Sequence, residues 1–564
     1  MARPASGSAD PGFRAQFIPK LVTVLREGYG GAEFRADLQA GLTVAIVALP
    51  LSMAIAIASG VGPERGLVTA IVGGFLVSAL GGSRFQIGGP AGAFIVLVAS
   101  CVMTIGVEGL VTATFLAGLF LLVAGFLRLG TYVKFIPYPV TLGFTAGIAV
   151  IIFASQVRDL AGLSLPSPEP SELLPKIEAL FAARGSVNPA ALAVSVGTIL
   201  VILALKRLRP HWPGLLIAVG LAAVAAAVLR LPVETIGTRF GELPRGLPAP
   251  GLPDLGRESL ARALPFALSF TLLGAIESLL SAVVADGMSG RRHRSNAELV
   301  AQGVANLGSA LFGGIPVTGT IARTATNVRA GSRGPVSGIL HALFVLAFML
   351  VAAPLASFIP LAALAGVLAT VAWNMAEREA IWSLLRHSRG EAAVLVVTFL
   401  LVIFRDLTEG IVVGFLLGAL LFIRRMSDAA QVEEGVAFVE GDVADDPHHF
   451  QPEATGDAIV YHLKGALFFG AAATVGSVLE RIADRPRLMV LDLSGVPFID
   501  SSGAHGIDLL ARKIRRAGGR LVLAGVPAEM RRTLAAAGLD ATAADFAPDV
   551  ASALAQADST AIRR

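Results

Sequence analysis

The feature that most constrains this chain is the stretch 38–63, which contains no charged side chain. A helix needs about 20 predominantly apolar residues to cross a lipid bilayer, and this stretch exceeds that length. Comparable apolar stretches recur as far as residue 425, and charged residues make up only 15% of the chain. Soluble domains carry about 25%. The sequence therefore predicts a polytopic α-helical membrane protein and excludes a soluble enzyme, a disordered scaffold and a secreted disulfide-rich module.

We expect fourteen membrane segments. Their predicted spans are 38–60, 66–81, 87–105, 109–128, 138–157, 188–205, 213–229, 260–285, 295–312, 318–328, 334–353, 360–376, 391–404 and 408–423. Basic side chains gather in the even-numbered loops and after the last segment: Arg84; Arg128 and Lys134; Lys206, Arg207 and Arg209; Arg291, Arg292 and Arg294; Arg329 and Arg333; Arg378, Arg386 and Arg389; Arg424 and Arg425. Positive charge marks the cytoplasmic side, so both ends are expected there, with residues 1–36 as an N-terminal cytoplasmic region that lacks a targeting segment.

Two short patterns repeat along the chain. Gly88-Gly89-Pro90 recurs loosely as Gly313-Gly314-Ile315-Pro316, and Phe135-Ile136-Pro137 recurs as Phe358-Ile359-Pro360. Both recur in the same order and at nearly the same separation. A repeat of seven segments, an odd number, places the second copy upside down, which is the inverted-repeat architecture of secondary transporters. Chance similarity between apolar segments is the alternative.

The composition changes near residue 427. A polar, acidic stretch follows, with 428–437 expected as a linker and 438–564 as a cytoplasmic domain. Residues 458–463, 488–493 and 521–523 read as strands and 502–517 as an amphipathic helix. This alternation predicts a small α/β domain.

Three places resemble one family: Gly88 to Phe94, the region from Gly274 to Thr324, and Phe498-Ile499-Asp500-Ser501-Ser502-Gly503. The chain resembles the sulfate-permease (SulP) anion transporters, relatives of prestin and pendrin, and its C-terminal domain resembles a STAS domain. The limits of several segments, above all the tenth, rest partly on this resemblance.

The resemblance implies a uracil-permease-like fold for the transmembrane transport domain, 37–427. Segments 1–4 and 8–11 would form a core and segments 5–7 and 12–14 a gate, in a homodimer with an elevator-like movement of core against gate.

The glycine- and proline-rich patterns predict half-helices that begin after Gly88-Gly89-Pro90 and after Pro316. Two opposed helix N-termini present free N–H groups and partial positive charge, which can hold an anion without a basic side chain. The expected lining is Ala91, Gly92, Ala93, Thr318, Gly319, Thr320 and Ile321. Tight helix packing is the alternative explanation for these small residues.

Two ionisable residues fall inside predicted segments. Arg323 lies about one turn into segment 10 and aligns with a family position that adds positive potential behind the anion; the alternative is that it extends to cytoplasmic water. Glu277 lies inside segment 8 and shares a helix face with Ser281. In the resembling family this acidic position is linked to cation coupling. Sodium-coupled bicarbonate relatives have Asp plus Thr there, so Glu plus Ser favours a proton. An ion pair between Glu277 and Arg323 is the alternative.

Segment 1 also enters the family's site. Its expected lining is Ala48, Leu51, Ser52 and Ile55. Many relatives have Gln at the Leu51 position and an aromatic residue at the Ile55 position, so this site is less polar, and Ser52 is a candidate to replace part of the lost polarity. In soluble STAS relatives the Ser501 position is phosphorylated, although a plain helix-capping role is preferred here.

No enzymatic chemistry, metal site or cofactor is predicted, and the single cysteine, Cys101, cannot form an intrachain disulfide. We expect a proton-coupled secondary transporter of sulfate, bicarbonate or a small dicarboxylate in the bacterial inner membrane. A sodium-coupled bicarbonate symporter, an uncoupled anion channel and a membrane-anchored signalling protein whose STAS domain binds a partner are the alternatives. Membrane lipid is the expected environment, and no nucleic-acid partner is expected.

Overall fold

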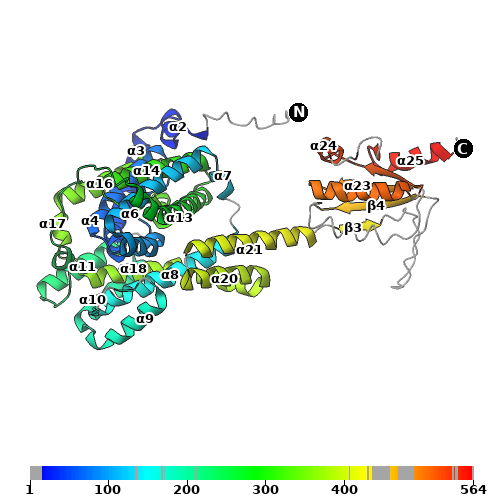
Figure 1. The fold of residues 1–564 in the computed structure, drawn as a ribbon. Helices are drawn as coiled ribbons and strands as arrows, with labels where there is room; N and C mark the ends of the chain where they lie inside the picture. Colours follow the sequence, from blue (N-terminus) through cyan, green and yellow to red (C-terminus); the bar gives the residue numbers. More distant parts are fainter. Residues whose placement is uncertain are drawn as a thin grey trace. The chain divides into compact units, whose positions relative to one another are not determined.

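The protein was analysed as a computed structural model, which describes residues 16–133, 137–166, 169–170, 172–209, 212–405, 407–428, 431–434, 458–465, 467, 488–516, 518–536, 539 and 544–561 (Figure 1). The chain forms two compact units, Met1–Phe415 and Leu416–Arg564. Long helices make up the first unit, and the second carries a mixed sheet with flanking helices.

Six spans in the described part of the first unit are long and apolar enough to cross a membrane: Gly31–Ala58, Pro63–Leu80, Gly92–Phe126, Tyr138–Ala161, Pro189–Leu208 and Arg257–Ser289. Two shorter apolar helices, Gly214–Val228 and Val336–Val351, accompany them. The prediction of a polytopic helical membrane protein is therefore confirmed at the level of fold class.

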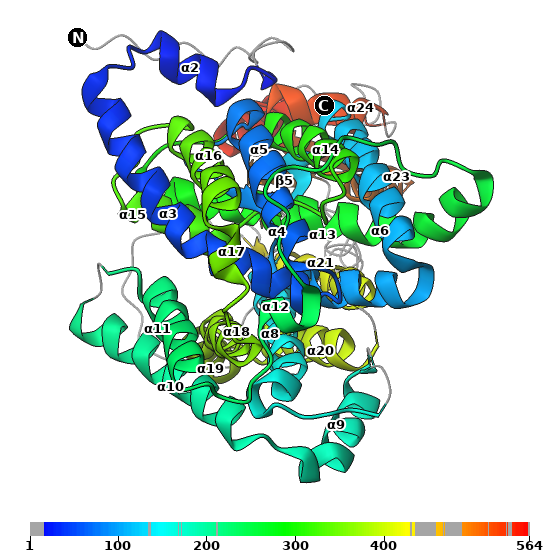
Figure 2. The ribbon, with the colours of Figure 1, turned by 90° about the vertical axis from the view of Figure 1, so that its left-hand side faces the viewer.

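The helices of this unit pack in two groups (Figure 2). The first group contains α3 (Gly31–Ala58), α4 (Pro63–Val68), α5 (Gly74–Leu80), α6 (Ile95–Phe126), α13 (Arg257–Ser289), α14 (Ser295–Leu311), α15 (Ile321–Arg329) and α16 (Val336–Val351). The second group contains α8 (Tyr138–Ala161), α10 (Pro189–Leu208), α11 (Gly214–Val228), α18 (Leu361–Met375) and α20 (Arg389–Phe404). Helix α21 (Leu407–Asp428) follows and crosses the boundary between the two units. Residues far apart in the sequence thus meet within each group, as α6 meets α13 and α14, and α8 meets α18 and α20.

Several boundaries differ from the hydropathy pattern. The predicted third and fourth segments both lie mainly in α6, which is divided by a sharp kink at Gly106, where the backbone angles are not helical (φ +73°, ψ −180°); this kink lies between the two predicted spans. The second segment is interrupted by a π-helical turn, Thr69–Gly73, between α4 and α5. Short helices fill the connections: α2 (Lys20–Arg26), α7 (Gly130–Val133), α9 (Leu173–Ala182), α12 (Ile236–Phe240), α17 (Ala353–Ala356) and α19 (Arg378–His387). Because these helices are short and of mixed polarity, a search for long apolar stretches does not detect them.

The second repeated pattern has a structural counterpart. Pro137 and Pro360 are the N-cap residues of α8 and α18, with nearly the same backbone angles (φ −64° and −68°, ψ 139° and 138°). Phe135 and Ile136 lie outside the described residues. Since α8 and α18 pack together in the second helix group, the two prolines begin partner helices.

The second unit is an α/β domain. Its strands run in the order β3-β4-β5-β6-β7, and all neighbours are parallel except β3 and β4. The bounds are β3 Gln431–Glu434, β4 Ala458–Lys464, β5 Leu488–Gly495, β6 Arg520–Ala524 and β7 Asp545–Ala547, with α23 Ser501–Arg516, α24 Ala528–Ala536 and α25 Val550–Ala561. Apolar side chains of α23 and α24 pack on one face of the sheet and those of α25 on the other. The predicted strands and helix are present, and β3 lies inside the stretch expected as a linker.

Helix α23 begins in the pattern that resembles the STAS signature. Asp500 caps it, since its Oδ1 accepts a hydrogen bond from the Gly503 N–H at 2.8 Å. The side chain of Ser501 lies outside the described residues, so its regulatory phosphorylation stays a prediction. Asp492 lies on strand β5, and burial by itself would raise the pKa of its carboxyl group. Hydrogen bonds with the Ser494 N–H and the His462 ring outweigh that effect and hold the pKa below its usual range.

Candidate anion-binding site

The candidate site is built around two very short strands. Gly88–Gly89 (β1) pairs antiparallel with Thr318–Gly319 (β2), with Gly88 opposite Gly319. A Cβ atom on Gly89 would overlap Arg323 Nη1, and one on Gly319 would overlap Gln86 Nε2. A Cβ atom at either position would therefore require the Arg323 or the Gln86 side chain to move.

A helix starts directly after each strand. The first is the 3₁₀ turn Gly92–Phe94, which continues into α6, and the second is α15, which begins at Ile321. The second half-helix begins after Pro316, as expected, and the strand β2 lies between Pro316 and the first residue of the helix. The strand pairing also places Thr318–Gly319, rather than Gly313-Gly314, opposite Gly88–Gly89, and Gly313 instead lies in the turn after α14.

The two helix starts offer unpaired backbone donors. The first N–H groups of a helix have no acceptor within it, which applies here to Gly92 and Ala93 and to Ile321 and Ala322. Gly92 and Ile321 are partly exposed and Ala322 is exposed, whereas Ala91 and Ala93 are buried. Gly92 faces the second helix group, since its Cβ position lies 3.3 Å from Ile152 Cδ1 and 3.8 Å from Met375 Sδ. The donors that follow β1 therefore lie at the boundary between the two helix groups.

Two threonine hydroxyls, one on β2 and one directly after it, support the pairing of β1 with β2. Thr318 Oγ1 donates to the Gly274 carbonyl of α13 at 3.1 Å, and Thr320 Oγ1 donates to the Ile87 carbonyl at 3.2 Å. Their hydroxyl protons are therefore engaged, and the free donors in this segment belong to the backbone.

Arg323 lies behind the paired strands β1 and β2. Its side chain is 1% exposed, and its Nη2 donates to Ser52 Oγ at 3.0 Å and to the Pro90 carbonyl at 3.3 Å. Nε and Nη1 have no hydrogen-bond partner. The guanidinium is thus fixed against β1 inside the first helix group, and it does not extend to the water phase.

Glu277 lies on the face of α13 that contacts both half-helices. Gly274 precedes it by one turn and binds Thr318, while Ser281 follows by one turn and donates to Thr324 Oγ1 at 3.0 Å. Glu277 is 7% exposed, and it makes no hydrogen bond or ion pair with any described residue, Arg323 included. Of the predicted pair, the serine hydroxyl is therefore engaged and the carboxylate is unpaired.

The predicted residues of segment 1 all lie in α3 and are buried: Ala48, Leu51, Ser52 and Ile55. Leu51 and Ile55 belong to the apolar core. Ser52 provides the polar contact by accepting from Arg323.

Residues 34–398 match the family model described as the sulfate permease family. The chain belongs to the sulfate permease family. Residues 449–553 match the STAS domain, so both predicted resemblances are confirmed. Membership makes the chain an integral membrane transporter and not an enzyme.

Three known proteins illustrate what this member of the family resembles. The Bacillus subtilis protein YvdB, provisionally named a sulfate transporter, is 40% identical over 91% of this chain and 95% of its own length. The bicarbonate transporter BicA of Picosynechococcus is 30% identical over 89% of this chain and 90% of its own length. The murine Solute Carrier 26 family member A9 anion transporter has the same fold, with a TM-score of 0.84 at 18% identity, covering 99% of this chain and 96% of that chain.

The sequence patterns missed a buried carboxylate near the candidate site. Glu298 on α14 is fully buried, and its Oε2 accepts from the Gly82 and Ser83 N–H groups at 2.9 and 3.0 Å. Its Oε1 accepts from Gln302 Nε2 at 3.1 Å and from Ser278 Oγ at 3.4 Å. Ser278 in turn accepts from Gln86 Nε2 at 2.7 Å, and Gln86 lies shortly before β1. In the sequence, Ser295-x-x-Glu298 resembles a capping box, a pattern in which the glutamate binds a backbone N–H at the start of its own helix. That pattern would assign Glu298 a role within α14 only.

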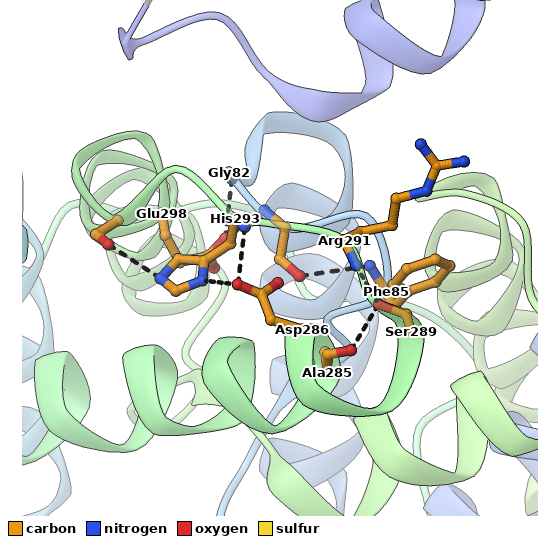
Figure 3. Close-up of polar contacts among 10 residues, drawn as sticks. Gly82, Phe85, Ala285, Asp286, Ser289, Arg291, His293 and Glu298 are labelled. Atoms are coloured by element: carbon orange, nitrogen blue, oxygen red, sulfur yellow. Dashed lines mark hydrogen bonds and ion pairs between the residues drawn. The ribbon is translucent and has the colours of Figure 1, made fainter. Parts of the chain in front are cut away.

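The connection between α13 and α14 is fixed by polar contacts (Figure 3). Asp286 Oδ2 lies 2.7 Å from His293 Nδ1 and accepts the His293 N–H at 3.0 Å, while His293 Nε2 lies 3.0 Å from Ser295 Oγ. Next to them, Arg294 Nη1 donates to the Ile18 carbonyl at 2.7 Å and to Thr23 Oγ1 at 3.0 Å. Burial, with repulsion from Arg84, lowers the pKa of Arg294. These contacts tie α2 to the loop beneath the site.

Proposed function

We propose that this member of the sulfate permease family is a secondary active transporter of a small anion. Its anion would be held between the N-termini that follow β1 and β2. The observation that carries the proposal is the convergence of two sets of unpaired backbone N–H groups in front of a buried guanidinium. Backbone donors and a helix dipole favour an anion, and a low-dielectric surrounding strengthens the attraction of Arg323.

Sulfate and bicarbonate are the favoured substrates. The relatives that support them are a provisionally named sulfate transporter and a bicarbonate transporter. Small dicarboxylates such as fumarate belong to the same chemical class. Both favoured substrates are small, oxygen-rich anions that backbone N–H groups can bind without a shape-specific side chain.

Movement between the two helix groups is the proposed transport step. The first group would be the core and the second the gate, together forming the fourteen segments of a 7+7 inverted repeat. Gly92 lies against residues of the second group, so a sliding movement of one group would expose the anion to alternate sides. We further propose a homodimer in the bacterial inner membrane with both termini in the cytoplasm.

Glu277 is the proposed coupling residue, with a proton as the transported cation. A buried carboxylate without a partner is costly when ionised, and a bound cation offsets that cost. Neutral Gln at position 277 would remove the cation site and leave the anion site intact.

In the variant Glu277→Gln, we expect uptake driven by an inward proton gradient to fall at least about tenfold, a typical size for coupling between sites. Anion exchange without a gradient should stay close to wild type. The variant Glu258→Gln on the exposed start of the same helix is the matched control and should retain gradient-driven uptake. Unchanged proton-driven uptake by Glu277→Gln would exclude this residue as the proton carrier.

A panel of radiolabelled anions in proteoliposomes tests the function as a whole. Sulfate, bicarbonate and fumarate would be offered under imposed pH or sodium gradients. Concentrative uptake with a pH gradient supports the proposal, while concentrative uptake that requires sodium supports the sodium-coupled alternative. Uptake that only follows the anion's own gradient identifies a channel, and no uptake of any anion contradicts the proposal.

A further inference from the structure

Helix α19 packs on the protein with one side and leaves apolar side chains exposed on the other. Leu384 packs with Leu142 of α8 and Leu395 of α20, whereas Trp382 and Leu385 are 60% and 38% exposed. The helix has ten residues and is therefore about 15 Å long, which is too short to cross a bilayer. A short amphipathic helix with exposed apolar side chains is typical of a segment that lies in the membrane surface.

The end of α10 indicates which part of the second helix group meets that surface. Helix α10 has 20 residues and spans about 30 Å, which matches the hydrocarbon thickness of a bilayer. Lys206 in its last turn donates from Nζ to Asn374 Oδ1 at 3.3 Å. Asn374 belongs to the last turn of α18, and α19 begins four residues later. The ends of α10 and α18 therefore meet α19 at one face of the membrane.

Two cations from different helices contact adjacent residues at this face. The Arg378 guanidinium carbon lies 4.0 Å from the centroid of the Trp373 ring, and Lys206 binds the neighbouring Asn374. All four side chains are exposed. Two adjacent residues thus gather an ammonium and a guanidinium, the two groups with which proteins bind phosphate oxygens.

The N–H groups of the first and last arginine of α19 are available to a ligand. Among the described residues, neither Arg378 nor Arg386 makes a side-chain hydrogen bond or an ion pair, and both contact aromatic rings instead. The Arg386 guanidinium carbon lies 5.1 Å from the centroid of the Trp382 ring. A guanidinium that stacks on a ring keeps the donors at its edge, so both arginines can still donate to a phosphate.

Basic side chains outnumber acidic ones in the segments that meet here. Of the acidic residues, Glu377 is hydrogen-bonded to the Tyr138 hydroxyl. The basic residues in 206–209 and 377–391 are Lys206, Arg207, Arg209, Arg378, Arg386 and Arg389, and the acidic ones are Glu377, Glu379 and Glu391. An excess of positive charge at a membrane surface attracts anionic lipids.

We propose that Lys206 and Arg378 bind the phosphate of an anionic phospholipid, whose headgroup lies against Trp373. Tryptophan suits this depth because its ring is apolar and its N–H is polar. A soluble phosphate would meet only the two cations, whereas a phospholipid also covers the exposed Trp382 and Leu385 with its apolar chains. The inference concerns the bilayer beside the second helix group and not the anion site, so its failure would leave the proposed function standing.

Quenching of tryptophan fluorescence by brominated lipids tests the proposal. The full-length protein with Trp212→Phe keeps Trp373 and Trp382 as the two tryptophans of the chain. It would be reconstituted in phosphatidylcholine vesicles that contain either brominated phosphatidylglycerol or brominated phosphatidylcholine. One basic residue near a membrane surface contributes about 1 kcal/mol, or about fivefold, to the binding of an anionic lipid. For two cations we therefore expect the anionic lipid to bind beside these rings about 25-fold more tightly than the zwitterionic one.

Variants distinguish a local site from general attraction by positive charge. Arg378→Gln and Lys206→Gln should each lower the preference for the anionic lipid about fivefold. Arg184→Gln is the matched control, since Arg184 lies 4.2 Å from the centroid of the Phe181 ring near the opposite end of α10. Arg333→Gln, at an exposed position beside the first helix group, changes the net charge equally. Both controls should keep the full preference.

Three results would overturn the inference. The first is equal quenching by the two brominated lipids before any change at the site, a result that needs no variant of Lys206 or Arg378. The second is an unchanged preference in the double variant Lys206→Gln/Arg378→Gln. The third is relief of the quenching by glycerol phosphate added in solution, which would identify a soluble phosphate as the ligand.

Discussion

Replacing Arg323 by methionine is expected to lower anion uptake about 100-fold and to leave the protein folded. At an effective dielectric constant of about 20, a unit charge about 5 Å from the anion contributes about 3 kcal/mol, which corresponds to roughly a hundredfold in affinity. A buried charge with unpaired nitrogen atoms is costly in the folded state, so its removal should not lower thermal stability. Initial uptake rates in proteoliposomes and a melting curve of the purified variant measure the two effects.

Two further variants distinguish the effect of the Arg323 charge from the effect of its hydrogen bonds. Ser52→Ala removes the hydroxyl that accepts from Arg323 Nη2 and keeps the guanidinium. Because the guanidinium keeps its charge and its hydrogen bond to the Pro90 carbonyl, the effect of this variant on uptake should be smaller. Arg323→Lys keeps the charge without the planar fork and should retain part of the activity. Uptake by Arg323→Met within threefold of wild type would show that the guanidinium does not act on the anion.

Replacing Glu298 by alanine is expected to produce the largest loss of stability. The carboxylate accepts four hydrogen bonds in a fully buried position, two of them from the backbone N–H groups of Gly82 and Ser83. Alanine would leave these donors unpaired, with a cost of about 3–5 kcal/mol. Because Gln86 reaches Glu298 through Ser278, β1 should lose its support and anion binding should fall as well.

A surface glutamate gives the matched control for this variant. Glu258 forms an ion pair with Arg262 in which both side chains are exposed, 79% and 64% respectively, and such pairs contribute about 0–1 kcal/mol. Glu258→Ala should therefore melt at the wild-type temperature in the same detergent. If Glu298→Ala melted at the same temperature as Glu258→Ala, the Glu298 carboxylate would not be a structural support of the site.

Local sequence patterns predicted much of the fold. Apolar length placed the membrane helices because the bilayer imposes a minimum span on each of them. Period-two and helical patterning placed β4, β5, β6 and α23 of the C-terminal domain because each side chain there points to one face or the other. Arg323 and Glu277 were found because charge inside an apolar segment is rare.

Non-local contacts could not be predicted in the same way. The pairing of Gly88 with Gly319 joins residues far apart in the chain, and nothing in either pattern indicates the register. The repeat of Gly88-Gly89-Pro90 as Gly313-Gly314-Ile315-Pro316 does not indicate which residues pair in space, and Gly313 lies in a turn while Thr318–Gly319 pairs with Gly88–Gly89. The contacts of Glu298 could not be predicted for the same reason, since its partners Gly82 and Ser83 belong to a distant, much earlier part of the chain.

Amphipathic connecting helices were missed for a different reason. Helix α19 is too short for a membrane span, and its arginines lie over aromatic rings, with Arg378 4.0 Å from the Trp373 ring centroid and Arg386 5.1 Å from that of Trp382. Both tryptophans are exposed, as is usual for side chains at a membrane interface. A search for apolar length passes over such helices, although their periodicity is strong.

The central claim is that an anion binds at the N-termini following β1 and β2, and cysteine protection tests it most directly. Cys101, the chain's one cysteine, is buried and would be replaced by alanine. Ala322→Cys then places a thiol on the exposed first turn of α15, and Ala330→Cys places one just beyond the opposite end. With sulfate or bicarbonate at about ten times its Kd, about a tenth of the sites stay free. Labelling of Cys at position 322 by a charged methanethiosulfonate should therefore slow about tenfold, with no change at position 330. Equal rates at position 322 with and without every anion of the panel would contradict the claim.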